Sequence, residues 1–328
     1  MKKSLLFVLM TGLLALFIAA CSSETSTEPE NGTQEEPAAE AETVNEEDAE
    51  ITVTHQFGET VVPKNPESVV VFDLGVLDVL ETLEVDAVTG IGEPSGGLPE
   101  YLAAFGGEYE GAGTLHEPDF EKVYDLQPDL IIISGRAQEA YDELSEIAPT
   151  LFMAVDTANY IESMTDNVTL LAEIFGKEAE AEEELAQISE SLDSLQEEAS
   201  TNDTEGLIIL ANDGSISAYG PGSRFGILHN EFGVKAVDEN IEVSNHGQNI
   251  SFEYIAEKNP EYLFVVDRGA IVGGESSAQQ TIENEVVKTT QAYESGNIIY
   301  LDPVYWYITS GGLTSTVGMI DEVSAALQ

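Results

Sequence analysis

Hydrophobic and polar positions follow the same order in two stretches of the chain, residues 119–136 and residues 251–268, which align without a gap at an offset of 132 residues. Each stretch predicts a short helix, a turn marked by proline, and an apolar run of strand length followed by an arginine. The apolar runs, Leu130–Ile133 and Tyr262–Val266, are continuous rather than alternating, which is typical of parallel strands buried on both faces. The repeat therefore predicts two similar α/β lobes, each with an arginine at the carboxyl end of a strand, where open α/β sheets bind ligands.

Short apolar runs and helical spacing alternate through the rest of the chain, which favours the α/β class with two Rossmann-like lobes. Further strands are predicted at residues 51–55, 61–62, 68–73, 87–92, 151–155, 207–211, 216–219 and 297–301. Further helices are predicted at residues 74–83, 98–105, 139–147, 227–232 and 313–327. The glycine-rich residues 106–113 are assigned to no element, since Gly111-Ala112-Gly113 lacks the third glycine of a dinucleotide site.

The stretch Tyr160–Ala199 has apolar residues every three to four positions and is broken once, at Gly176. This spacing predicts two helices, of which the second would be about 35 Å long at about 1.5 Å per residue. A helix of that length between two α/β halves indicates a rigid spine, because two heptads of leucine and isoleucine are too few to favour a coiled coil. We expect an N-terminal lobe over residues 51–160, a helical linker with the spine over residues 161–200, and a C-terminal lobe over residues 201–328.

The first 50 residues predict export and attachment to a membrane. Residues 1–20 combine a basic start, an apolar core and small residues, as secretory signals do, and are too short for a mature membrane span. Cys21 is the only cysteine of the chain and completes a sequence that resembles a bacterial lipobox, so we expect lipid on its thiol. The alternative is an ordinary signal followed by a stray cysteine. Residues 21–50 offer little to bury and predict a disordered acidic tether.

Acidic residues dominate the composition and disfavour one class of partner. The chain has 62 acidic residues against 11 lysines and arginines, and this net charge of −51 argues against nucleic acid. Residues 21–50 hold 11 of the acids and no lysine or arginine, and the first twenty residues hold two lysines, which leaves −42 for residues 51–328. We interpret this acidic surface as adaptation to high salt or alkaline surroundings, because salt weakens its self-repulsion.

Arginine is rare against this background. The chain has three arginines, Arg136, Arg224 and Arg268, of which the first and last occupy equivalent positions in the repeat. Arg224 stands in the glycine-rich turn 220–226 before a predicted helix, where anions are favoured. The planar guanidinium stays charged and donates several hydrogen bonds at once, which suits an anionic ligand. The alternative is that each arginine pairs with a local acid or caps a strand.

Motifs of common enzymes are missing from the sequence: there is no zinc-protease helix motif, nucleophile elbow, phosphate loop or cysteine pair. No two of the four histidines have helical ligand spacing. We expect His55, His116 and His229 at the surface or in the core, whereas His246, in the polar loop 245–247, is a candidate for a site. We expect a protein that is not an enzyme, although a residue count leaves a hydrolase with two carboxylates open.

Together these features resemble the iron-siderophore-binding lipoproteins of bacterial ABC importers, and above all their petrobactin and catecholate branch, over essentially all of residues 51–328. The resemblance lies in the lipobox, the Pro-Asp-Leu-Ile-Ile strand, the spine helix, the Gly-Pro-Gly-Ser-Arg turn, Asn-His-Gly, the Asn-Pro-Glu-Tyr-Leu strand that ends in arginine, and Tyr-Trp-Tyr near the end. It implies a fold like that of class III periplasmic binding proteins, with two Rossmann-like lobes joined by a single long spine helix around a shallow cleft that closes little.

The resemblance also implies a set of site residues. In the catecholate branch three arginines line the cleft, which corresponds to Arg136, Arg224 and Arg268. A histidine and a tyrosine ligate iron directly when the siderophore leaves two positions open, which corresponds to His246 and Tyr307. The neighbours Tyr305 and Trp306 are candidates either for the cleft wall or for the core, and the choice of Tyr307 over Tyr305 depends on the resemblance.

The resemblance further implies a function: the chain binds a ferric siderophore, of the catecholate or mixed catecholate-citrate (petrobactin-like) type, and delivers it to an ABC importer. We expect a lipid-anchored monomer on the extracellular face of a Gram-positive cell membrane, with no permanently bound cofactor. A corrinoid-binding or haem-binding transport lipoprotein is the alternative, and a secreted enzyme or a structural surface lipoprotein is the alternative of another class. By resemblance Glu121 and Glu253, equivalent in the repeat, dock on the permease; solvated surface glutamates are the other interpretation.

Overall fold

The computed structural model of the protein describes residues 49–104 and 110–328. The predicted signal peptide, Cys21 and nearly all of the predicted tether therefore lie outside the described residues. The first described elements are the strands β1 (Glu50–His55) and β2 (Gly58–Pro63), which pair antiparallel and contain the two strands predicted at residues 51–55 and 61–62. In the described part of the chain, no helix is both long enough and apolar enough to cross a membrane.

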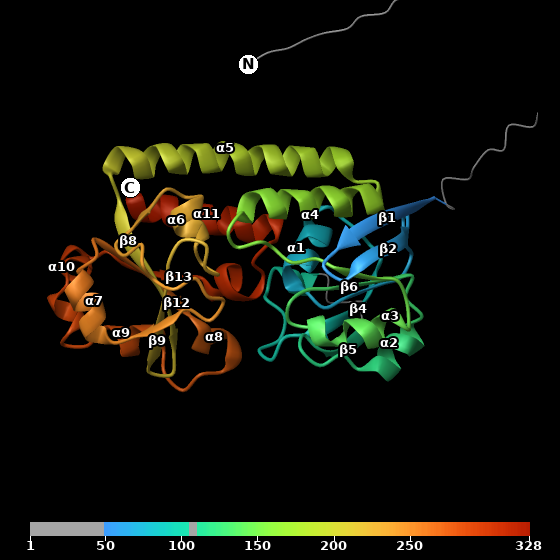
Figure 1. The fold of residues 1–328 in the computed structure, drawn as a ribbon, viewed down its shortest axis with the longest axis horizontal. Helices are drawn as coiled ribbons and strands as arrows, with labels where there is room; N and C mark the ends of the chain where they lie inside the picture. Colours follow the sequence, from blue (N-terminus) through green and yellow to red (C-terminus); the bar gives the residue numbers. More distant parts are fainter. Residues whose placement is uncertain (1–48, 105–109) are drawn as a thin grey trace, which may run out of the picture. The chain divides into compact units, whose positions relative to one another are not determined.

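The first lobe is built on a parallel five-stranded sheet with the strand order β5-β4-β3-β6-β7. Figure 1 labels β4, β5 and β6 of this sheet. Its strands are β3 (Val69–Val71), β4 (Val88–Glu93), β5 (Glu110–Thr114), β6 (Leu130–Ile133) and β7 (Thr150–Phe152). Its helices are α1 (Leu74–Thr82), η2 (Leu102–Ala104), α2 (Phe120–Leu126), η3 (Gln138–Ala140) and α3 (Tyr141–Ser145). Every residue of the central strands β3 and β6 is buried, as expected for a sheet with both faces covered.

The second lobe is built on a six-stranded mixed sheet with the order β11-β9-β8-β12-β13 and with β10 beside β8. Its strands are β8 (Glu205–Asn212), β9 (Ser215–Tyr219), β10 (Lys235–Ala236), β11 (Gln248–Ile250), β12 (Tyr262–Asp267) and β13 (Ile298–Leu301). Strands β8 and β9 pair antiparallel, because Asp213 (φ 46°) and Gly214 (φ 83°) form a two-residue turn with positive φ at both positions. The sheet is therefore only partly parallel.

Short helices connect the strands of this second lobe, and a longer helix follows the last strand. They are α6 (Ile227–Asn230), α7 (Phe252–Lys258), α8 (Arg268–Val272), α9 (Ala278–Ile282), η4 (Val287–Thr289), α10 (Gln291–Ser295), the π-helical turn η5 (Val304–Ile308) and α11 (Leu313–Leu327). The last of these, α11, packs on α5 and also on α1 of the first lobe. The end of the chain is thus shared between the two lobes.

The sequence repeat has the same local structure in both lobes. Asp119 and Ser251 cap the helices α2 and α7 through their side chains, which accept hydrogen bonds from backbone N–H groups of the first turn. Both helices end in a left-handed residue with φ 48°, Gln127 in α2 and Asn259 in α7, and a proline follows each. The chain then enters β6 or β12, each of which lies between two parallel neighbours. The predicted repeat is confirmed.

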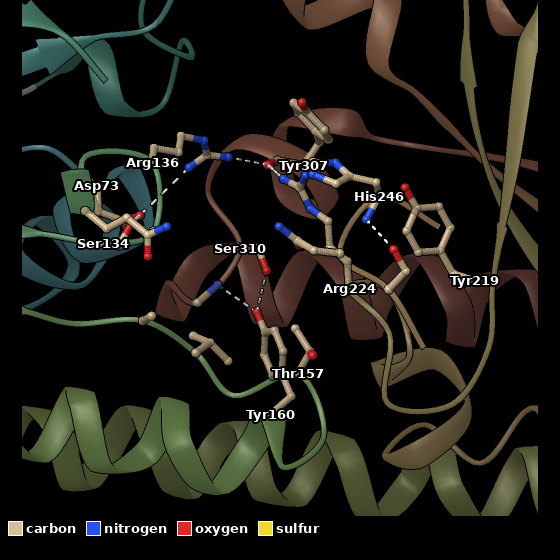
Figure 2. Close-up of a pocket in the computed structure, with 18 of the residues that line it drawn as sticks. Asp73, Ser134, Arg136, Thr157, Tyr160, Tyr219, Arg224, His246, Tyr307 and Ser310 are labelled. Atoms are coloured by element: carbon tan, nitrogen blue, oxygen red, sulfur yellow. Dashed lines mark hydrogen bonds and ion pairs between the residues drawn. The ribbon is translucent and has the colours of Figure 1, made fainter. Parts of the chain in front are cut away.

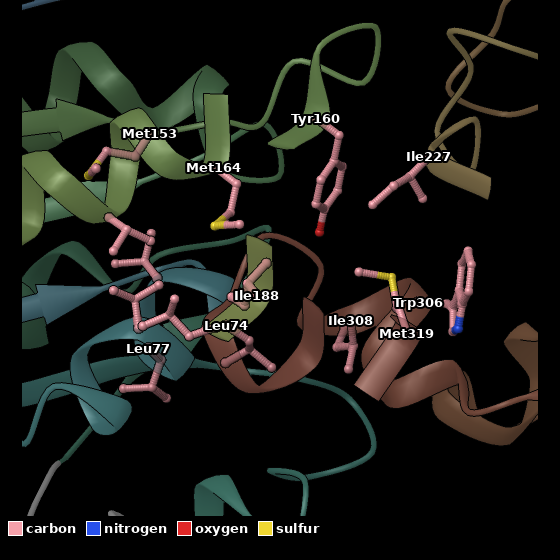
Figure 3. Packing of buried hydrophobic residues seen from close by; sticks show 14 of the residues in the cluster. Leu74, Leu77, Met153, Tyr160, Met164, Ile188, Ile227, Trp306, Ile308 and Met319 are labelled. Carbon is pink, nitrogen blue, oxygen red and sulfur yellow. The ribbon is translucent and has the colours of Figure 1, made fainter. Parts of the chain in front are cut away.

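Two long helices connect the lobes, as the apolar spacing predicts. Helix α4 (Tyr160–Phe175) ends at Gly176, whose φ of 65° suits glycine, and α5 (Glu178–Asn202) runs from α4 beside the first lobe to β8 of the second (Figure 1). One hydrophobic core cluster spans both lobes and these helices, and Figure 3 shows a part of it. Members of this cluster include Leu77, Met164, Ile188, Trp306 and Met319. Because the core is continuous, the two lobes share buried surface.

The structure differs from the predicted elements in two places near the glycine-rich segment. Residues 110–114, assigned to no element, form the edge strand β5 on β4. Position 113 requires glycine, because its φ is 106° and because a Cβ there would collide with the backbone of residues 117–119. Within the predicted helix 98–105 only the single turn η2 is helical, and residue 105 lies outside the described part. The sequence does not predict β5 because glycine has a low strand propensity. In the structure, pairing with β4 outweighs that low propensity.

Candidate functional site

A cavity of about 1080 Å³ lies between the lobes at the carboxyl ends of the strands, where parallel sheets place their ligand sites. Its lining comes from the segments after β3, β6 and β7 in the first lobe, and from β8, β9, the turn at 222–224, the loop at 243–246 and the start of α8 in the second. The loop that follows η5 completes the wall. All five residues proposed for ligand binding, Arg136, Arg224, His246, Arg268 and Tyr307, line this cavity.

Arg136 reaches the cavity from the turn after β6. Its Nη2 donates to the carbonyl oxygen of Tyr307 at 2.8 Å, and its Nη1 lies 3.8 Å from Oδ2 of Asp73. Asp73 is itself held in place, since its carboxylate caps α1 through Val76 N (3.0 Å) and accepts a hydrogen bond from the Ser134 hydroxyl. The Asp73 charge therefore partly offsets one of the three guanidiniums.

Arg224 and Arg268 approach from the second lobe. Nη2 of Arg224 donates to the same Tyr307 carbonyl at 2.8 Å, and its guanidinium lies 4.1 Å from the centre of the Tyr307 ring. Arg268, the first residue of α8, donates through Nε to the Tyr307 hydroxyl at 2.9 Å and through Nη1 to Asn212 Oδ1 at 3.0 Å. The three arginines, far apart in sequence, thus converge on one residue. Figure 2 shows Arg136 and Arg224 beside Tyr307.

Tyr307 stands in the π-helical turn η5, a conformation that recurs at functional sites. The turn closes on the hydrogen bond from Thr309 N to Val304 O (3.0 Å), and the Tyr307 carbonyl accepts from Arg136 and Arg224 instead of from the backbone. Burial raises the pKa of the phenol, but the hydrogen bond from Arg268 and the nearby charges of the three arginines outweigh it, so the pKa lies below its ordinary value. The surroundings of Tyr307 therefore make ionisation of its phenol easier than in water.

The crowding of positive charge also affects Arg224. Burial lowers the pKa of the Arg224 guanidinium most, and the nearby positive charge of Arg136 lowers it further. Both effects disfavour the charged form, so an anion placed between the two side chains would be bound with a gain in electrostatic energy. The lining of the cavity therefore favours a negatively charged ligand.

His246 lies on the opposite side of Arg224 from Tyr160 in Figure 2 and is exposed. Its backbone N–H donates to Ser244 Oγ at 3.1 Å, and the next residue, Gly247, has φ 72°, which orders the polar loop around the histidine. A Cβ at Gly247 would collide with the ring of Tyr219, so the loop lies directly on β9. The imidazole is therefore accessible at the edge of the cavity.

The remaining predicted residues lie elsewhere. Glu121 and Glu253 are exposed in the first turns of α2 and α7, outside the cavity, at equivalent places on the two lobes. Trp306 is 1% exposed and donates to Glu322 Oε2 at 2.9 Å, so it belongs to the core rather than to the cleft wall. Tyr305, half-buried against Tyr101, also does not line the cavity.

Most residues that line the cavity were not candidates from the sequence, and three of them bear on its charge and extent. Asp73 and Asn212 lie at the ends of β3 and β8, and a polar residue after a buried strand was the available signal. His116 is exposed, as expected, but it lines both this cavity and a neighbouring one of about 270 Å³ that shares Arg136, Arg268 and Tyr307. It follows β5, the strand that the sequence did not predict, so no pattern pointed to it.

Metal-binding side chains do not form a cluster of the usual kind in residues 49–104 and 110–328: no three His, Cys, Asp or Glu side chains gather where they could hold an ion. Two of the other histidines, His55 and His229, each make one local hydrogen-bonding contact through a ring nitrogen. His55 Nε2 lies 2.8 Å from Thr60 Oγ1, and His229 Nδ1 lies 2.8 Å from Val234 O. These two keep the surface and core roles expected of them.

Known proteins resemble this chain over its whole folded part. A family model described as periplasmic binding protein matches residues 69–305. The petrobactin-binding protein YclQ of Bacillus subtilis is 45% identical over 332 residues, with 100% of both chains covered. The ferric-anguibactin-binding protein FatB of Vibrio anguillarum is 30% identical over 90% of this chain and 92% of its own length.

Solved structures agree with these relatives. The crystal structure of YclQ superposes with a TM-score of 0.82 at 48% identity, over 85% of this chain and 99% of the other. The periplasmic catecholate-siderophore binding protein VctP of Vibrio cholerae superposes with a TM-score of 0.80 at 36% identity, over 84% of this chain and 100% of the other. The expected fold, two α/β lobes joined by a long helix, is confirmed. With the family match over residues 69–305 and full-length similarity to YclQ, this chain belongs to the periplasmic binding protein family.

Proposed function

We propose that the chain binds a ferric siderophore, of the catecholate or mixed catecholate-citrate type, outside the membrane and delivers it to an ABC importer. The observation that carries this proposal is the convergence of Arg136, Arg224 and Arg268 on Tyr307 in the wall of an interlobe cavity. The names of the relatives support it, since YclQ, FatB and VctP are described as binding petrobactin, ferric anguibactin and a catecholate siderophore.

Electrostatics explain why arginines are needed. Iron(III) held by three catecholates carries about three negative charges, and each pair of unit charges at 4 Å is worth about 4 kcal/mol at an effective dielectric constant near 20. The folded part of the chain is strongly acidic, so its surface as a whole repels such a ligand. A local group of three guanidiniums reverses the sign of the field where the ligand binds and donates charge-assisted hydrogen bonds to catecholate oxygens.

Direct contact with the metal is the second part of the proposal. A siderophore that fills only four positions of an octahedral iron(III) leaves two for the protein, and a phenolate oxygen and an imidazole nitrogen suit this ion. Tyr307 supports this role because its pKa is lowered and the residue lines the cavity. His246 supports it because it is exposed at the edge of the same cavity. For a siderophore that fills all six positions, both side chains would contact only the organic part.

Delivery requires an anchor and a docking surface. We propose that Cys21 carries lipid, that the acidic segment after it is a tether on the extracellular face of a Gram-positive membrane, and that the protein acts as a monomer without a permanent cofactor or a catalytic role. Glu121 and Glu253, exposed at equivalent places on α2 and α7, would contact basic residues of the permease. The acidic surface would suit high salt or alkaline surroundings.

The test is a titration of the intrinsic fluorescence of the protein with ferric catecholate, ferric mixed catecholate-citrate, a corrinoid and haem. We expect quenching with the first two ligands and weaker binding as salt rises, because exposed charges are screened. R224Q should weaken binding of the ferric catecholate by at least about tenfold, since a charge-assisted contact is lost. K258Q is the matched control, because Lys258 pairs with Asp238 outside the cavity. No quenching by any catecholate, together with tight corrinoid or haem binding, would refute the proposal.

A further inference from the structure

Asp78 is a buried carboxylate that ligand recognition, as described above, does not use. It lies in α1 of the first lobe, its side chain is 0% exposed, and it is the only Asp, Glu, Lys, Arg or His in the buried class of the described residues. An ionised carboxylate in the interior is costly unless hydrogen-bond donors compensate it. Its partners therefore show why the position holds an acid.

The donors to Asp78 come largely from the other end of the chain. The backbone N–H groups of Thr314 and Ser315 donate to its Oδ1 and Oδ2 at 3.0 and 2.9 Å, and the Tyr101 hydroxyl donates to Oδ2 at 3.0 Å. Thr314 and Ser315 are in the first turn of α11, whose own cap residue, Gly312, has no side chain. Asp78 thus caps a helix that begins more than 230 residues later. A Cβ on Gly312 would overlap with the Asp78 side chain, so glycine at this position admits the carboxylate.

The start of α11 is in turn bonded to the turn that holds Tyr307. The Ser315 hydroxyl donates to Thr309 O at 2.7 Å, and both the N–H and the hydroxyl of Thr309 donate to Val304 O at 3.0 and 2.8 Å, which closes η5 around Tyr307. A second anchor from the first lobe acts on the same segment, since Gly311 N donates to Tyr160 Oη at 2.7 Å (Figure 2). A short path of hydrogen bonds therefore joins Asp78 to the residue on which the arginines converge.

We propose that Asp78 is a positioning residue for ligand binding: by capping α11 across the lobe boundary it holds the segment 307–315, and with it the Tyr307 carbonyl and phenol, at a fixed place between the arginines of the two lobes. This inference rests on the proposed function for its binding readout. Burial raises the pKa of the Asp78 carboxyl and these hydrogen bonds oppose the rise, so the helix start and the carboxylate stabilise each other. Without the cap, the Tyr307 carbonyl would no longer be held where Arg136 and Arg224 meet.

The test compares D78N and Y101F with two control variants in the full chain. The amide in D78N keeps the shape of the carboxylate but turns one acceptor into a donor that faces N–H groups, so the cap fails on one side. We expect at least about tenfold weaker binding of the ferric catecholate by D78N, and about two- to threefold weaker binding by Y101F, which removes a single donor. The controls are L144A, in a separate core cluster of the first lobe, and Y141F, both outside the cavity. Affinity is measured at a temperature where circular dichroism shows every variant folded.

A purely structural role makes a different prediction: D78N and L144A would both lose thermal stability, and both would keep the affinity of the parent chain. Unchanged affinity in folded D78N would therefore overturn the proposal. If D78N does not fold, Y101F takes its place and Y141F is its control. Unchanged affinity in Y101F would then overturn the proposal.

A second readout needs no ligand and so remains valid if the proposed function fails. Spin labels on E143C and E294C, exposed sites of the two lobes in a C21S background, report the distance between the lobes. We expect the distance distribution to broaden in D78N and to stay narrow in L144A. An equally narrow distribution in D78N would contradict the anchoring role, whereas failure of every siderophore to bind the parent chain would contradict only the proposed function.

Discussion

At the scale of single residues, Tyr307 is the point where the contacts of the cavity converge. Its carbonyl accepts from Arg136 and Arg224, its hydroxyl accepts from Arg268, and its ring lies under the Arg224 guanidinium. The backbone and the side chain of Tyr307 therefore have separate tasks. The carbonyl orients two cations whatever the side chain is, whereas the phenol is the part that would ligate a metal ion under the proposed function.

Replacement of Tyr307 by phenylalanine separates these tasks. Y307F keeps the carbonyl and the ring, so we expect an affinity change of no more than about threefold for a hexadentate ferric catecholate. For a tetradentate ligand that leaves iron positions open, we expect a loss of at least about tenfold, because a metal ligand disappears. The measurement is a fluorescence titration together with the visible absorbance of the phenolate–iron bond. Y305F, outside the cavity, is the control; equal effects on both ligand types would exclude a metal contact.

The ionisation of Tyr307 gives a dependence on pH. Its folded-state pKa lies below the ordinary value of about 10, so its phenolate contributes stability that is present above that ordinary value and is lost as pH falls through the lowered pKa. We expect the difference in tyrosinate absorbance between the parent chain and Y307F to titrate below pH 10. In R268Q the same transition should move to higher pH, because a donor and a positive charge are removed. A transition at or above the ordinary pKa in the parent chain would contradict this.

At the scale of secondary-structure elements, the start of α11 depends on the first lobe. Its cap residue, Gly312, has an ordinary φ of −83°, so glycine is needed there for space rather than for backbone conformation. The space is filled by the Asp78 carboxylate, which takes over the capping role that a serine or aspartate at position 312 would have in an isolated helix. The contact between α1 and α11 is thus both a cap and a link between the two lobes.

A methyl group at position 312 tests this link without a change of charge. We expect G312A to lower the free energy of unfolding by about 1–3 kcal/mol, the usual cost of overpacking, because the new Cβ overlaps with Asp78. G135A is the control, since a Cβ there meets no atom within 4 Å. Urea unfolding of both variants measures the difference. Equal stability of the two would mean that the capping contact has room for a side chain.

The order of the elements shows what the pattern of the sequence could predict. The paired helix–turn–strand units, the two long helices and their break at Gly176 follow from apolar spacing and from local capping signals, and all are confirmed. The edge strand β5 was missed because its glycines carry no strand signal and only pairing with β4 defines it. The antiparallel pairing of β8 with β9 was not predicted either, although the tight turn at Asp213 and Gly214 was a local signal for it.

At the scale of the whole molecule, the two lobes present similar outer surfaces and a shared inner one. Helices α2 and α7 display Glu121 and Glu253 at equivalent positions of the repeat, away from the cavity. Inside the cavity the equivalence extends only to Arg136 and Arg268, because Arg224, His246 and Tyr307 come from the second half of the chain. The two outer glutamates thus keep the symmetry of the repeat, whereas most of the candidate ligand residues inside the cavity do not.

Charge reversal on the outer surface tests the proposed docking. The double variant E121K/E253K should lose uptake of the ferric siderophore by cells while it keeps ligand affinity, because both sites are exposed and remote from the cavity. The matched control is D125K/E257K, whose positions are also equivalent in the repeat and lie later in the same two helices. Cellular iron uptake is measured beside binding in solution. Unchanged uptake in E121K/E253K, or an equal loss in the control, would argue against docking through these glutamates.

The fold class, the repeat and the candidate cations could be predicted from the sequence, because apolar spacing and helix capping are local properties of short stretches of chain. The sequence also pointed to Arg136, Arg224 and Arg268 through their rarity. Only the tertiary structure decided how these residues meet. The capture of the Tyr307 carbonyl by two arginines and the cap of α11 by Asp78 join residues more than 80 positions apart. Such contacts depend on how the two lobes pack together, and the spacing of residues along the chain does not encode that packing.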